Sequence, residues 1–116
     1  MAAGGRGEGG DGGPDAAGVG RFLGGERPPP GTSPALRGCW HGLRGDWEAA
    51  HAAVQEAEGT PDADLVHAWL HRVEGDDGNA AWWYRRAGRP AGTGDTDAEG
   101  RAIAAALLAA AAARPG

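Results

Sequence analysis

Histidine and carboxylate residues at helical spacing are the strongest sign of chemistry in this chain. Asp64 is followed by His67, His71 and Glu74, and on a helix these four positions fall within an arc of about 80°. His67 and His71 are i,i+4, the spacing at which two imidazoles on one helix face bind a single metal ion. His51 supplies a possible third ligand, and Glu74 a further ligand or a general base. The pattern points to a site for a divalent metal such as zinc.

The same residues allow two other interpretations. In the favoured one, the imidazoles form hydrogen bonds to neighbouring helices and fix their register, and the purified protein carries no metal. In the other, they line a site for an organic ligand or a partner. The glutamate of the zincin motif H-E-x-x-H is absent, because residue 68 is alanine. If His71 is buried and hydrogen-bonded, His71→Ala should lower stability by about 1–3 kcal/mol.

Aromatic and arginine side chains gather in the same part of the chain and offer a second candidate site. The five tryptophans lie between residues 40 and 83, and most large aromatics in a small domain belong to its core, as we expect for Trp47, Trp69 and Trp83. Trp82 lies on the opposite helix face from Trp83, together with Asn79 and Arg86. The candidate binding surface consists of Trp69, Arg72, Asn79, Trp82 and Arg86.

Composition narrows the class of protein. A net charge of −5 argues against nucleic-acid binding, which needs a basic face. The single cysteine, Cys39, rules out an internal disulfide framework and fits a reducing compartment. The first residues lead into glycine without the apolar region of a secretory signal, and the apolar run at 102–113 is too short to span a bilayer. We therefore expect a soluble, cytoplasmic protein that binds neither nucleic acid nor membrane.

Turn and capping residues divide residues 35–114 into about five helices. Gly59, Gly75 and Gly88 mark helix ends. Asp46, and either Asp76 or Asp77, mark helix starts, and removal of such a cap typically costs about 1 kcal/mol. The expected helices cover 35–43, 46–58, 60–74, 76–87 and 96–113, the first weakened by two glycines and the last opened by a capping box at 96–99. With no strand-like alternation, the predicted class is all-α.

A shift of 30 residues aligns part of the chain with itself. Gly45-Asp46 falls on Gly75-Asp76, and His41 falls on His71. Four apolar positions also match: Leu36, Cys39, Trp40 and Leu43 fall on Val66, Trp69, Leu70 and Val73. The predicted unit is a helix, a tight Gly-Asp turn and a second helix, which buries its apolar face only by stacking on the next unit. Two such hairpins, capped by the last helix, make a short stack.

Two resemblances follow from these residues. The segment from Gly75 to Pro90, with a Gly-Asp turn and then small and aromatic residues, resembles the second half of a tetratricopeptide-type repeat. That resemblance implies stacked helical hairpins that bind other proteins. Residues 67–88 also fit the pattern H-A-x-L-H-R-x-E-G-D-x-x-N-A-x-x-W-Y-x-R-A-G, which looks like the signature of an uncharacterised family of small helical proteins. The second resemblance implies no particular activity.

The glycine- and proline-rich start of the chain has a different character. Residues 1–34 contain only Val19, Phe22 and Leu23 as sizeable apolar residues, too few to offset the entropy of folding. We expect a disordered tail at 1–34 and a repeat-like helical domain at 35–114. Deleting residues 1–33 should then leave the thermal midpoint within a few degrees.

The favoured function is a small binding or scaffold module for a protein or peptide partner, without a cofactor and without enzymatic activity. The alternative is a metal-binding protein or small metal-dependent enzyme. Its candidate residues are His51, His67, His71 and Glu74. The metal content of the purified chain distinguishes the two.

Overall fold

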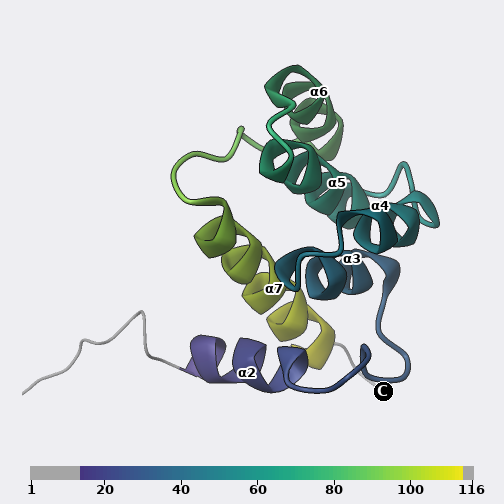
Figure 1. The fold of residues 1–116 in the computed structure, drawn as a ribbon, viewed down its shortest axis with the longest axis vertical. Helices are drawn as coiled ribbons and strands as arrows, with labels where there is room; N and C mark the ends of the chain where they lie inside the picture. Colours follow the sequence, from purple (N-terminus) through teal and green to yellow (C-terminus); the bar gives the residue numbers. More distant parts are fainter. Residues whose placement is uncertain (1–13, 114–116) are drawn as a thin grey trace, which may run out of the picture.

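A computed structural model describes residues 14–113, and all the regular structure in that range is helical (Figure 1). The predicted all-α class is confirmed. The helices are α2 (Pro14–Leu23), α3 (Pro34–Leu43), α4 (Trp47–Gln55), α5 (Pro61–Val73), α6 (Asp77–Ala87) and α7 (Thr96–Ala113). Within the described residues, none of these helices is both long enough and apolar enough to cross a membrane.

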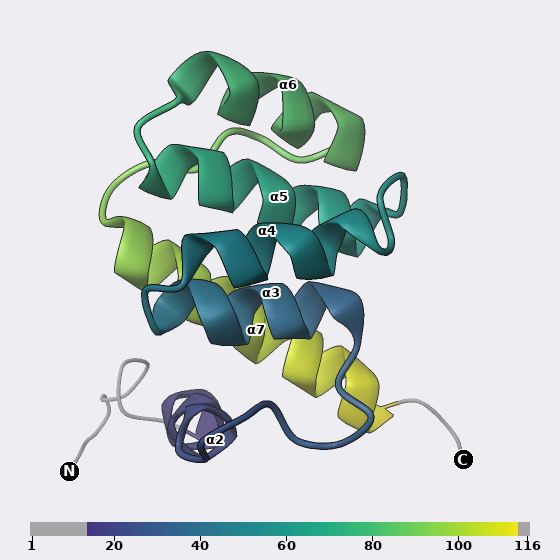
Figure 2. The ribbon, with the colours of Figure 1, turned by 45° about the vertical axis from the view of Figure 1, so that its right-hand side comes forward.

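Two helical hairpins, α3–α4 and α5–α6, form the body of the molecule, and α5 lies at its centre. Seen from the side, α6, α5, α4 and α3 follow one another from top to bottom (Figure 2). α5 packs against α3, α4, α6 and α7. α7 crosses α3 and α5, and α2 packs against α7 at the lower end of the molecule. The central position of α5 leaves most of its surface buried, including the polar residues Asp64, His67 and His71.

The two hairpins turn in the same way. Gly45 and Gly75 both have φ of +88°, a conformation that glycine adopts without the steric cost of a side chain. Asp46 and Asp76 follow them, and each donates its backbone N–H to a carbonyl of the preceding helix at 2.9 Å. Each aspartate side chain then accepts a hydrogen bond from the backbone N–H three residues on, which caps the second helix. Asp76, and not Asp77, therefore caps α6.

Other helix ends depart from the sequence-based expectation. α4 ends at Gln55, before the predicted end near Gly59. The capping box predicted at 96–99 does not form. Asp95 instead accepts the backbone N–H of Ala98 at 2.8 Å, and the Glu99 side chain turns to Arg72 on α5. A long-range ion pair with a partly buried arginine has displaced the local contact.

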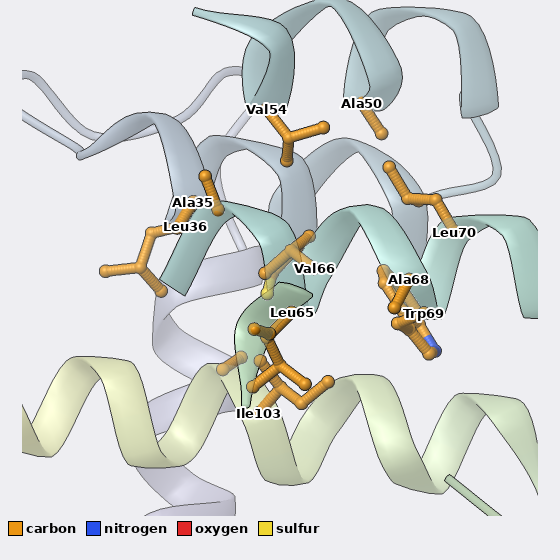
Figure 3. Packing of buried hydrophobic residues seen from close by; sticks show 14 of the residues in the cluster. Ala35, Leu36, Ala50, Val54, Leu65, Val66, Ala68, Trp69, Leu70 and Ile103 are labelled. Atoms are coloured by element: carbon orange, nitrogen blue, oxygen red, sulfur yellow. The ribbon is translucent and has the colours of Figure 1, made fainter. Parts of the chain in front are cut away.

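Close helix contacts in the core depend on glycine. Val66, Trp69 and Leu70 of α5 are almost completely buried among residues of α3, α4 and α7 (Figure 3). A Cβ atom at Gly42 of α3 would lie 2.6 Å from the Trp69 ring, and one at Gly38 would lie 2.6 Å from Val54. The two glycines lower the helix propensity of α3, but they let it approach its neighbours closely.

The folded part of the chain begins earlier than predicted. Residues 14–23 form α2, whose Val19 and Phe22 belong to the hydrophobic core. The Trp40 indole donates a hydrogen bond to the Phe22 carbonyl at 3.1 Å. The prediction of a disordered segment was wrong for this helix, because its few apolar residues share one face and dock on the rest of the fold. Deleting residues 1–33 should therefore lower the thermal midpoint. The expected disorder of residues 1–13 lies outside the described residues.

Candidate metal centre

Three imidazoles from two helices meet beside the centre of the molecule. His51 comes from α4, and His67 and His71 come from successive turns of α5. One possible ligand atom from each ring lies within 4.8 Å of the other two. His67 and His71 are only 3% and 7% exposed, and His51 is half-buried. The structure thus brings together the three histidines that the sequence offered as metal ligands.

Hydrogen bonds orient all three rings. The Nε2 atoms of His67 and His51 are 2.9 Å apart, so one of them donates to the other. Nδ1 of His71 lies 2.7 Å from Glu74 Oε1. An ionised carboxylate only accepts hydrogen bonds, so in neutral His71 the proton lies on Nδ1 and the lone pair on Nε2. Glu74 therefore selects the tautomer of His71 that can bind a metal through Nε2.

Tryptophan rings hold the imidazoles from outside. Trp47 stacks on His51, with ring centroids 4.6 Å apart and an interplanar angle of 14°. Trp83 stacks on His67, with centroids 3.8 Å apart at 20°. The Trp47 indole also donates to the Leu70 carbonyl at 2.8 Å, which ties α4 to α5. We predicted Trp47 and Trp83 only as core residues. The i,i+4 spacing of Trp47 and His51 was the available sign that they stack.

Burial lowers the pKa of two of the three rings, those of His67 and His51. Desolvation, with smaller contributions from the neighbouring His51 and His71, lowers the pKa of His67 to about 4. Burial and His71 also lower the pKa of His51, while the nearby Glu74 and Glu58 act in the opposite direction. Neutral imidazole is the form that binds metals. Nδ1 of His67 is buried and has no hydrogen-bond partner within the described part of the chain.

Asp64 lies on the same face of α5 as His67 and His71, but its role is structural. It is 2% exposed, and its Oδ1 accepts the backbone N–H of Gly59 at 2.9 Å. Its Oδ2 lies 3.9 Å from Nε of Arg86 on α6. Asp64 therefore closes the turn between α4 and α5, and it is not one of the three residues whose ligand atoms converge. Asp76 is close to His71 and Glu74, but its carboxylate caps α6.

The predicted binding surface is divided between two sides of the molecule. Trp69 is 1% exposed, and its indole donates to the Thr96 carbonyl at 2.7 Å. Arg72 forms an ion pair with Glu99 of α7. Both side chains therefore bind α7, and they do not form a binding surface together with Trp82. Their side of α5 is the one that α7 covers, and this could not be deduced from local spacing.

The remaining residues of that prediction lie on α6. Asn79 donates its side-chain amide to Asp76 at 2.9 Å and so supports the cap. Trp82 is 44% exposed, and the Arg86 guanidinium lies 5.0 Å from the centre of its ring. Trp82 and Arg86 therefore form an exposed cation–π pair on the outer side of α6, while the neighbouring Trp83 faces the imidazoles.

A polar network that the sequence did not reveal joins α7 to the second hairpin. Glu99 accepts hydrogen bonds from Arg72 of α5 and from the Tyr84 hydroxyl of α6. Burial and the contact with Glu99 raise the pKa of Tyr84. Buried tyrosine hydroxyls usually have a hydrogen-bond partner, and that was the available signal. Glu99, Arg72 and Tyr84 therefore stabilise the packing of α7 against α5 and α6.

Other reactive or hollow places do not add to the centre. Cys39 is completely buried, and burial raises the pKa of its thiol to about 12, so it is not available as a thiolate. A surface hollow of about 380 Å³ lies between the starts of α3 and α5 and the end of α7. Asp62 is the only ionisable residue among the described residues that line it. The convergent imidazoles remain the best candidate for chemistry.

No protein-family model, curated protein or solved structure matches the chain. The function of the site is therefore inferred from its geometry. Its useful features are three imidazoles, a carboxylate that orients one of them, and two tryptophans that hold the other two. Such a set can bind a metal ion, or it can join α4 to α5 by hydrogen bonds alone.

Proposed function

We propose that this protein binds one divalent transition-metal ion between α4 and α5, through His51, His67 and His71. The observation that carries the proposal is the convergence of one ligand atom from each ring within 4.8 Å. Nitrogen ligands of a tetrahedral zinc ion lie about 2.0–2.1 Å from the metal, and so about 3.3 Å from one another. The 2.9 Å between His51 Nε2 and His67 Nε2 is slightly shorter, so binding would replace their hydrogen bond with a small separation of the rings.

The surroundings support a cation. Glu74 accepts the Nδ1 proton of His71, an arrangement that orients metal-binding histidines and strengthens them as ligands. Glu58 and Glu74 are also close enough to act on the charge of His51. Imidazole ligands without a thiolate suit zinc, copper and nickel better than magnesium or calcium. We therefore expect zinc or a similar ion.

Zinc titration of chelator-treated protein tests the proposal. Calorimetry should give saturable binding of one ion per chain. His51→Gln should weaken binding by more than tenfold, and because His51 is half-buried, this variant has the best chance of folding normally. His41→Gln is the matched control: His41 is also half-buried, but it packs against Trp40 and lies outside the convergent group. Circular dichroism checks that both variants fold.

The same experiment tests the interpretation in which the histidines only fix helix register. In that case the wild-type chain would bind no zinc in a saturable way. His51→Gln would then lower the thermal midpoint by the same amount with and without zinc. If the ion binds as proposed, zinc should raise the midpoint of the wild type and of His41→Gln, and should leave His51→Gln almost unchanged.

A second candidate function is a binding module of tetratricopeptide-like kind. The matching Gly-Asp turns of the two hairpins support the internal repeat, and the exposed Trp82–Arg86 pair supports a surface for a protein or peptide. Cross-linking from a photoreactive residue at position 79 should identify a partner. Trp82→Ala should then weaken the purified partner's binding while leaving the thermal midpoint unchanged. Equal binding by the variant would count against this surface.

Two further expectations also stand as proposals. A cytoplasmic location is supported by the single cysteine, which is buried. Membership of an uncharacterised helical family is supported by the pattern at 67–88. That pattern includes His67, His71 and Glu74, so the proposed ion would lie within its most distinctive part.

A further inference from the structure

We infer that the ion at this site keeps one coordination position for an external ligand, and that it binds a small anion there through a nitrogen or oxygen donor. This inference rests on the proposed metal binding and concerns what the bound ion can do. It would make the centre a place where an anionic ligand meets a Lewis acid. A closed structural site would not have that property.

The number of available donors is the first argument. Structural zinc sites usually have four protein ligands, whereas sites with three keep a position for water or substrate. Within the described residues, only three side chains converge around the proposed position, those of His51, His67 and His71. Glu74 and Asp76 both lie close to His71, but Glu74 is hydrogen-bonded to His71 Nδ1 and the Asp76 carboxylate caps α6. Residues 14–113 therefore supply no fourth side chain to this group of ligand atoms.

Access to solvent is the second argument. The faces of the His51 and His67 rings are covered by Trp47 and Trp83. His51 itself remains half-buried, and Gln55 and Glu58, which follow it on α4 and in the adjoining turn, are exposed. The side of the cluster that belongs to α4 is thus partly open to solvent. A small ligand would approach the ion from this side.

Charge is the third argument. Three neutral imidazoles leave the double positive charge of a divalent ion uncompensated at the centre. Glu74 offsets part of that charge through His71, and the exposed Glu58 acts only from a distance through solvent. An anion that binds directly to the ion would complete both its coordination and its charge balance. The expected ligands are hydroxide, azide and small carboxylates.

Cobalt substitution tests this inference, because the visible spectrum of cobalt(II) responds to changes in its ligands. The full-length protein is loaded with cobalt and titrated with azide. We expect stoichiometric cobalt binding and then a saturable change in the visible bands. If cobalt binds and azide leaves the spectrum unchanged, the site is closed and the inference is wrong, while the proposed metal binding survives. If cobalt and zinc both fail to bind, both proposals are wrong.

Two variants test whether a carboxylate fills the open position. Glu58→Gln and Glu74→Gln each remove the charge of an acidic group near the cluster that does not cap a helix, and keep a similar shape. We expect azide to change the cobalt spectrum in both variants and in the wild type, with His41→Gln as the control for unrelated substitution. An azide response that appears only in Glu58→Gln or only in Glu74→Gln would identify that carboxylate as the fourth ligand and would overturn the inference.

Discussion

The hairpins α3–α4 and α5–α6 make the same Gly-Asp turn, and yet their polar faces differ in chemistry. On α3, Arg37 forms an ion pair with Glu56 in the turn after α4, and Arg44 covers Trp40 and donates to the Leu23 carbonyl. Thirty residues later on α5, the corresponding positions hold His67 and Glu74. Where the first hairpin has two arginines, the second therefore has the buried imidazole of His67 and the carboxylate of Glu74.

The difference arises from the neighbours of each helix. α5 has α4 on one side and α6 on the other, so its polar stripe is covered, and Trp83 of α6 stacks on His67. His41, which corresponds to His71, packs edge-on against Trp40 and stays half-buried. The two Gly-Asp turns therefore have the same backbone conformation. Packing between helices decides which histidines are buried together and can act as ligands.

The largest expected effect tests the apolar side of α5, which faces the first hairpin and α7. Trp69→Ala should lower the free energy of unfolding by about 3–5 kcal/mol, the usual cost of truncating a buried aromatic side chain. Trp82→Ala is the control on α6 and should change it by no more than about 0.5 kcal/mol, because that side chain is largely exposed. Urea denaturation measures both. Similar small losses would contradict the assignment of Trp69 to the core.

The next largest expected loss of stability distinguishes His71 from His41, the residue at the corresponding position of the first hairpin. His71→Ala should lower stability in metal-free protein by about 1–3 kcal/mol, because it removes a buried group and leaves Glu74 without its partner. His41→Ala should cost less, since His41 is only half-buried. Denaturation in the presence of a chelator measures the difference. If His41→Ala costs as much as His71→Ala, the two hairpins do not differ in the way that we describe.

A glycine substitution tests the close contact between the hairpins. Gly42→Ala places a methyl group against the buried Trp69 and Leu70 side chains. Overpacking of this kind costs about 1–3 kcal/mol, offset by up to about 1 kcal/mol of gained helix propensity. We expect a net loss of about 1–2 kcal/mol. Gly78→Ala in α6 meets no atom within 4 Å and should not destabilise. A stabilising Gly42→Ala would show that the helices can separate easily.

The smallest expected loss of stability concerns the two Gly-Asp turns and tests whether they are equally strong. Asp46→Ala and Asp76→Ala should each cost about 1 kcal/mol, since each removes the side-chain cap of a helix. Asp77→Ala should have almost no effect, because Asp76 makes the capping bond to the Asn79 N–H. Thermal unfolding of the three variants measures the differences. A large loss in only one of Asp46→Ala and Asp76→Ala would mean that the two turns differ in strength.

The predictions from sequence succeeded where the cause was local. The all-α class and the Gly-Asp turns follow from glycine and aspartate acting on their own segments. The prediction that His67 and His71 share one face of a helix also succeeded. The predicted capping box at 96–99 was wrong because Arg72, far away in the sequence, binds the Glu99 side chain. α4 also ends earlier than predicted, at Gln55. α2 was missed because three apolar residues are too few to stabilise an isolated helix. In the folded protein, α2 packs against α7, which is far away in the sequence.

The amino-acid sequence by itself determined where most helices begin and end and which histidines share one face of α5. These features depend on backbone conformation and on residues three or four apart. Only the tertiary structure decided that His51 joins His67 and His71, that Trp69 is buried beneath α7, and that Trp82 stays outside. Those outcomes depend on how helices far apart in the chain pack together. The proposed metal centre exists only where α4 and α5 meet.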